Sequence, residues 1–259
     1  MLDSAAYNSI YNSVFFRNEF ANIQKKTLQP GNNDSWTATY IFGQNTYLEL
    51  FNNGRDENDG LSGIAFCVET SGGVDSLYNK LKKKGISSFE KGLRTQKTET
   101  GESPWFYFLA SAQRDSNSLL STWLMEYDFK FMKKKFPDLK PETINITRKL
   151  YNSDVYRKDL LLKDIIEIEL ALNQHDRDKF YNELKIYGYQ IEQQGELLTA
   201  KGPAINIIMH PKSAANEAGI CRIKFSLTDK SYKPKTMIVS PKLKLTLNND
   251  KTADWYFKI

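Results

Sequence analysis

Apolar residues recur at helical spacing in three segments of the chain. The first segment follows Asp3 and Ser4, two residue types that cap helices well, and the other two segments span 74–84 and 176–187. Glycines follow the second and third segments, and glycine is favoured just beyond a helix end. The pattern therefore predicts three helices, the first of them carrying Tyr7, Ile10, Tyr11, Val14 and Phe15 on its apolar side.

Between and after these helices, apolar–polar alternation and runs of aromatic and β-branched residues predict strands. The predicted strands are 36–42, 46–51, 63–69, 89–98, 105–112, 121–129, 166–172, 189–194, 196–200, 204–210, 221–227, 242–247 and 253–257. The order strand, helix, strand, strand, strand occurs twice, and the last strands resemble a further copy without its helix. The chain is therefore expected to be an α+β protein of repeated βαβββ units, forming concave mixed sheets with helices on the outer face.

The same pattern divides the chain into domains. Residues 1–137 are expected to hold two paired units, the first lacking its first strand. Residues 138–163 are polar and weakly patterned, which is typical of a linker, and residues 164–259 are expected to hold degenerate third and fourth units.

Composition narrows the function classes. The 259 residues are 40% hydrophobic and 26% charged, which is ordinary for a globular protein. The net charge of +5 is spread along the chain without a basic stripe or base-stacking motif, so no nucleic-acid partner is expected. No apolar run reaches the roughly 18 residues of a membrane span. The chain as it stands is expected in the cytoplasm, or exported if an upstream signal segment is missing.

Nucleophilic catalysis finds no support in the motifs. Cys67 and Cys221 lie far apart and neither has a histidine beside it in sequence. Of the two histidines, His175 is expected on the surface at a helix start. His210 ends a strand and is read as a surface residue, although a ligand role in the second half stays open.

Strand alternation selects the candidate binding residues. Glu49 shares a strand face with Tyr47, and Glu126 shares one with Leu124, so both carboxylates are expected to point into one cleft. Buried carboxylates are costly unless paired, hydrated or bound to a cation, and Arg94 is a candidate partner. Four further rings pair by strand face, namely Trp36 with Tyr40 and Trp105 with Tyr107. Such rings suit a planar or sugar-like ligand, or alternatively fill the core of a sheet.

The segments Thr46–Phe51, Gly63–Glu69, Val74–Tyr78 and Trp123–Tyr127 together resemble the vicinal oxygen chelate superfamily of glyoxalases, bleomycin-resistance proteins and extradiol dioxygenases. Within it the chain looks most like a group of uncharacterised bacterial proteins. The resemblance implies one divalent metal ion held by the first and last strands of paired units. Glu49 and Glu126 match the last-strand ligand positions, whereas the first strand of the second unit offers only Ala65, Cys67 or Glu69 in place of histidine.

Two functions follow from this incomplete ligand set. The chain is expected to be a glyoxalase-like small-molecule-binding protein without a complete metal site. The alternative is a divalent-metal-dependent lyase, isomerase or dioxygenase that uses Glu49 and Glu126. A third, structural reading also stays open. Loss of the first strand would leave a sheet edge unpaired, and a homodimer is expected to cover it.

Overall fold

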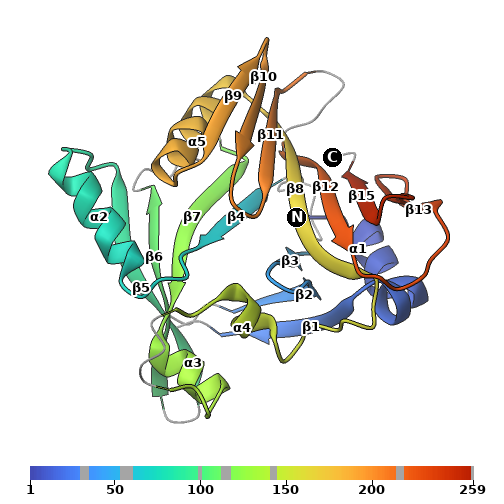
Figure 1. The fold of residues 1–259 in the computed structure, drawn as a ribbon, viewed down its shortest axis with the longest axis horizontal. Helices are drawn as coiled ribbons and strands as arrows, with labels where there is room; N and C mark the ends of the chain where they lie inside the picture. Colours follow the sequence, from blue (N-terminus) through green and yellow to red (C-terminus); the bar gives the residue numbers. More distant parts are fainter. Residues whose placement is uncertain are drawn as a thin grey trace. The chain divides into compact units, whose positions relative to one another are not determined.

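The computed structural model describes residues 1–29, 35–52, 61–98, 101–111, 118–140, 145–213 and 219–257, drawn in Figure 1. These residues form two compact units. The first unit comprises Met1–Lys25, Ala38–Ser62 and Val155–Ile259, and the second comprises Lys26–Thr37 and Gly63–Asp154. The predicted domains follow chain order, whereas the first unit combines three separate stretches. Residues 112 and 141–144, in a predicted strand and the predicted linker, lie outside the described residues.

The largest sheet belongs to the first unit and has eight strands. Their order is β13-β14-β15-β12-β8-β11-β10-β9. The strands are β8 (Leu162–Leu172), β9 (Gln190–Gln194), β10 (Leu197–Lys201), β11 (Asn206–Pro211), β12 (Gly219–Leu227), β13 (Lys235–Ser240), β14 (Leu243–Leu247) and β15 (Thr252–Phe257). β8 pairs with β11 in parallel and with β12 in antiparallel orientation. Helix α5 (Gln174–Ile186) connects β8 to β9 and lies along β8, β9 and β11 (Figure 1).

Alternation gives this sheet two different faces. On one face the side chains are apolar and fully buried, including Leu170, Met209, Phe225, Leu245 and Trp255. The intervening positions carry polar and charged side chains, and we call this side the polar face. It is defined by Glu167, Glu169, His210, Arg222 and Asp254.

The N-terminal part of the first unit begins with helix α1 (Ser4–Tyr11). The Asp3 side chain accepts a hydrogen bond from the Ala6 N–H at 2.8 Å, as its predicted capping role requires. The Tyr7 hydroxyl lies 2.7 Å from the Thr39 hydroxyl, which places the helix on the Thr39 side of strand β2 (Trp36–Phe42). A short π-helix, η1 (Phe16–Phe20), follows α1 and packs its Phe16 ring 5.5 Å from Trp255.

Strand β2 forms a hairpin with β3 (Tyr47–Leu50) and also pairs with β1 (Asn22–Leu28), giving a three-stranded sheet. The hairpin turn is held by Asp164 of β8. Its carboxylate accepts hydrogen bonds from the Asn45 backbone N–H at 3.2 Å and from the Thr46 hydroxyl. Leu2 makes one parallel bridge to Asn52, beside the end of β3.

The second unit contains a four-stranded sheet in the order β4-β7-β6-β5. Its strands are β4 (Ser62–Cys67), β5 (Phe89–Thr98), β6 (Gly101–Ser111) and β7 (Leu120–Tyr127), and its helices are α2 (Gly73–Lys83), α3 (Phe129–Lys135) and α4 (Arg148–Asn152). Helix α2 connects β4 to β5 and packs on β5, β6 and β7. The prediction of an α+β protein is confirmed. Each helix among the described residues is too short or too polar to span a lipid bilayer.

Candidate functional site

Glu49 lies in the first unit, within a group of aromatic rings. Its partner across the β2–β3 hairpin is Tyr40, and Phe42 is the partner of Tyr47. The three ring centroids are 5.8 to 6.1 Å apart. Since Thr39 contacts α1 and its neighbour Tyr40 points the other way, Glu49 lies on the face turned away from that helix.

We call these four side chains, Tyr40, Phe42, Tyr47 and Glu49, the aromatic–carboxylate group, and they differ in solvent exposure. Tyr40 and Phe42 are buried, whereas Tyr47 is half-buried and Glu49 keeps an exposed surface. The Glu49 carboxyl is nevertheless surrounded by protein atoms, and this burial raises its pKa to about 7, against the opposing effect of a hydrogen bond from Tyr40. Glu49 is therefore an exposed residue whose carboxyl group has its pKa raised to about 7.

Glu126 has a different environment, in the second unit. It is buried on β7, and its two oxygens accept backbone hydrogen bonds from Gly72 at 2.6 Å and from Val74 at 3.0 Å. Gly72 is the N-cap of α2 and has no side chain with which to cap it. Glu126 thus caps α2 from a neighbouring strand, where a negative charge also complements the helix dipole. These two hydrogen bonds compensate the buried carboxylate without a cation. Glu126 was expected to line an open cleft, but it is buried.

The two tryptophans predicted to bind a ligand, Trp36 and Trp105, pack in the core of the second unit. Trp36 and Trp105 stack at 6.2 Å, and Trp105 belongs to a buried cluster with Met125 and Tyr127. Tyr107 instead pairs with Glu126 and donates a hydrogen bond to Asp128 at 3.3 Å.

The prediction that Trp105 and Tyr107 share one strand face is wrong. The pairing register of β5 and β6 shifts between Arg94 and Thr95, whose partners are Phe106 and Pro104, so Trp105 falls in a bulge. The bulge breaks the alternation and turns Trp105 away from the face of Tyr107.

Arg94, the candidate partner of the two carboxylates, lies on β5 of the second unit. It is exposed, and its guanidinium carbon lies 5.2 Å from the centroid of the Phe108 ring. Burial raises the pKa of the Cys67 thiol to about 12 and that of Cys221 to about 11, so neither thiol is a ready nucleophile. Glu69, the remaining first-strand candidate, is paired with Arg148 at 2.9 Å.

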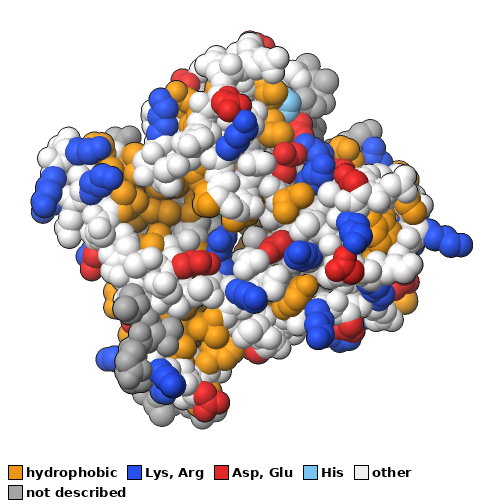
Figure 2. All heavy atoms as spheres, viewed as in Figure 1, with side chains coloured by type: hydrophobic (Ala, Val, Ile, Leu, Met, Phe, Trp, Pro, Cys, Tyr) orange, Lys and Arg blue, Asp and Glu red, His pale blue; other side chains and the backbone are white. Residues whose placement is uncertain are grey.

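A charged network that the sequence analysis missed lies on the polar face. The Arg222 guanidinium contacts Glu167 at 2.6 Å, Glu169 at 2.6 Å and Asp254 at 2.8 Å. Glu169 also contacts His210 Nε2 at 2.6 Å, and Asp254 accepts a hydrogen bond from Asn248 at 2.7 Å. We call these six side chains the Arg222 network. Figure 2 shows acidic and basic side chains adjoining one another over β8, β12 and β15.

The signal for this network was present in the chain. Glu167 and Glu169 alternate with apolar residues on a long strand. Arg222 and Asp254 likewise stand at the polar positions between apolar neighbours on two other strands. Charged residues in the middle of central strands need partners across the sheet. Strand order was the missing information, because the partners are 32 to 55 positions apart in sequence.

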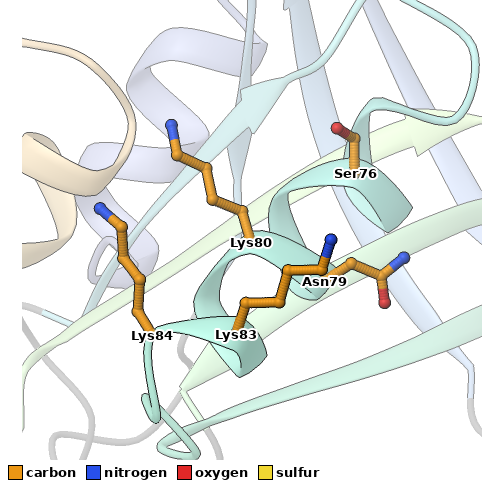
Figure 3. Close-up of a pocket in the computed structure, with 5 residues that line it drawn as sticks. All are labelled: Ser76, Asn79, Lys80, Lys83 and Lys84. Atoms are coloured by element: carbon orange, nitrogen blue, oxygen red, sulfur yellow. The ribbon is translucent and has the colours of Figure 1, made fainter.

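Two other features carry no site. Within the described ranges, no three or more His, Cys, Asp and Glu side chains converge to hold a metal ion. A hollow on α2 is lined by Ser76, Asn79, Lys80, Lys83 and Lys84 (Figure 3). All five come from this one helix and its C-cap, and the lysines complement the negative C-terminal end of the helix dipole.

Comparisons with known proteins place the chain in a family. Residues 1–257 match the description "Family of unknown function (DUF5829)". No curated protein matches the chain. The crystal structure of a hypothetical protein from Staphylococcus aureus is similar over 92% of this chain and 91% of that one, with a TM-score of 0.50 and 11% identity. At this identity the likeness concerns the fold alone.

Proposed function

The chain belongs to the DUF5829 family, and we propose that it is a small-molecule-binding protein of the vicinal oxygen chelate kind that binds its ligand without a metal ion. The observation that carries the proposal is the aromatic–carboxylate group of the first unit. It combines an accessible carboxyl group with rings that can contact a planar molecule.

The sheet orders support repeated βαβββ units. In the β4–β7 set the first strand lies beside the last, and the order is first, fourth, third, second. The β8–β11 set has the same order, with α5 between its first and second strands as α2 is in the other set. The β12–β15 set repeats this order without a helix, and β12 lies beside β8, so two first strands are neighbours.

The metal-free form of the proposal is favoured by the surroundings of Glu126. Both of its oxygens serve the amide groups at the start of α2, and a divalent ion would have to compete with them. On the polar face, the carboxylates of one first strand (β8) and one last strand (β15) are paired with Arg222, which lies on the neighbouring first strand, β12. The chain's own side chains thus satisfy the charges that would otherwise call for a cation.

The ligand is a planar molecule that stacks on Tyr47 and presents a hydrogen-bonding group to Glu49. Because Tyr40 and Phe42 are buried, they support the contact surface from behind. A cationic group on the ligand would select ionised Glu49, whereas a neutral acceptor would select the protonated form.

Binding of benzamidine, a planar cation, is expected to tighten as the pH rises from 6 to 8. With the pKa of Glu49 at about 7, the ionised fraction increases across this interval. The apparent Kd should therefore fall roughly tenfold, since affinity scales with the population of the competent form. Titration calorimetry on the intact chain measures it, and the Glu49→Gln variant should bind more weakly with no pH dependence.

Benzamide, the neutral isostere, serves as the matched probe and should not gain affinity at high pH. Equal pH profiles for wild type and Glu49→Gln would sink the ligand site. The metal question is settled separately, by metal analysis after soaking with Zn, Mn, Fe and Ni and removing the excess. A stoichiometric ion lost in both Glu49→Ala and Glu126→Ala would overturn the metal-free form and favour the metalloenzyme.

A further inference from the structure

His210 stands at the open end of the Arg222 network. Its side chain is 34% exposed, and its Nε2 lies 2.6 Å from Glu169 Oε1. The other oxygen of Glu169 is held by Arg222 Nε, also at 2.6 Å. Three neighbouring strands, β11, β8 and β12, therefore contribute one linear chain of contacts that runs from the guanidinium to the imidazole.

The pairing of Arg222 is complete without His210. Arg222 already has three carboxylate partners, and Glu169 would remain paired with Arg222 if His210 were replaced. A role in stabilising the sheet therefore explains Arg222, Glu167 and Asp254 but leaves the imidazole unexplained. Ordering a half-exposed side chain costs conformational entropy, so its fixed orientation calls for another reason.

The contact with Glu169 sets which ring nitrogen is free. An ionised carboxylate can only accept a hydrogen bond, so Nε2 donates to Glu169, and in the neutral imidazole Nδ1 is then the nitrogen with the lone pair. Nδ1 has no hydrogen-bond partner in the part of the chain that the structure describes. Orientation of an imidazole by a carboxylate, with the second nitrogen left free, is the arrangement of a proton acceptor in catalytic sites.

We propose that His210 is the proton acceptor of a second site, on the polar face of the eight-stranded sheet, which takes a small molecule through a hydroxyl group or an attacking water. Glu169 orients the imidazole, and Arg222 is a positioning residue that holds Glu169. This site is separate from the aromatic–carboxylate group around Glu49, and its failure would leave the proposed function standing.

The Cys221 thiol is not the nucleophile of this site. Cys221 donates a weak hydrogen bond to the Glu169 carbonyl oxygen at 3.3 Å, and burial raises its pKa to about 11. The group that loses its proton to His210 must therefore come from the ligand or from water. The chemistry is that of general-base activation.

Hydrolysis of p-nitrophenyl acetate tests the proposal on the intact chain. The water oxygen bonds to the carbonyl carbon while Nδ1 takes one of the water's protons, and the bond to p-nitrophenolate then breaks. The imidazolium and the acetic acid formed each release one proton to solvent, which leaves acetate and free His210. We expect wild type to exceed the buffer rate and His210→Gln to lose roughly tenfold or more of that excess. The chain has only two histidines, so His175→Gln, at an exposed position, is the matched control and should keep the wild-type rate.

Two further variants test the relay. Glu169→Gln should lower the rate nearly as much as His210→Gln, and Arg222→Lys should retain more activity than Arg222→Met. Thermal melts of each variant show that the protein is folded. A wild-type rate equal to that of buffer, an unaffected His210→Gln variant or an equally damaged His175→Gln variant would each overturn the proposal. Absence of a solvent deuterium isotope effect would make His210 a nucleophile and overturn its role as a proton acceptor.

Discussion

Replacement of Arg222 by methionine is expected to lower the free energy of unfolding by about 3 kcal/mol, the lower end of the range for breaking a buried ion pair. Methionine fills a similar volume but leaves Glu167 and Glu169 of β8 without their partner, facing Asp254 of β15 across β12. These carboxylates are 10 to 22% exposed, so water relieves only part of their repulsion. Urea denaturation followed by circular dichroism measures the effect.

The control removes the carboxylates instead of the guanidinium. In a Glu167→Gln, Glu169→Gln, Asp254→Asn background, the Arg222→Met change should cost far less, because no charge is left without a partner. Arg222→Lys should fall between wild type and Arg222→Met, since one ammonium cannot reproduce three separate guanidinium contacts. A loss below about 1 kcal/mol in the single Arg222→Met variant, as for an exposed ion pair, would contradict this account.

The second large effect is expected at Glu126. Its replacement by alanine removes two charge-assisted hydrogen bonds from the start of α2, and we expect a loss of about 2–4 kcal/mol. Hydrogen exchange of the α2 amides should accelerate most in the first turn, where the backbone loses its acceptors. Urea denaturation gives the size of the loss.

Glu90 offers a matched control, because it is an exposed glutamate on β5 of the same unit. Glu90→Ala should change the free energy of unfolding by no more than about 0.5 kcal/mol. If Glu126→Ala left both stability and α2 exchange unchanged, the capping role would be wrong. A loss of bound metal in that case would return Glu126 to its predicted role as a ligand.

The elements were predictable where local pattern and tertiary packing agree. α2 and α5 have apolar stripes and end before glycines, and both were predicted within two residues at each end. β1 was missed because its sequence, Asn-Ile-Gln-Lys-Lys-Thr-Leu, has too few apolar residues to alternate. β13 was also missed; it is the outermost strand of its sheet, and its exposed Ile238 interrupts the pattern.

The candidate sites were less predictable, for a physical reason. Strand alternation predicted that Glu126 would need a compensating partner, but it could not distinguish a cation from the amide groups of Gly72 and Val74. Glu49 was selected by its strand face, and its raised pKa needed the surrounding atoms to be known. The bulge at Trp105 likewise comes from strand pairing, which no single strand sequence encodes.

The hydrogen bonds from the Asn45–Thr46 turn to Asp164 also govern the order in which the chain can fold during synthesis. The turn leaves the ribosome about a hundred residues before its acceptor, at roughly 5–20 residues per second. Residues 63–154, which make up most of the second unit, are complete by then. The β2–β3 hairpin therefore lacks its hydrogen bonds to Asp164 for several seconds or longer. In that interval a nascent chain exposes Tyr40, Phe42 and Tyr47 to chaperones, and slowing translation beyond residue 62 should lengthen the contact.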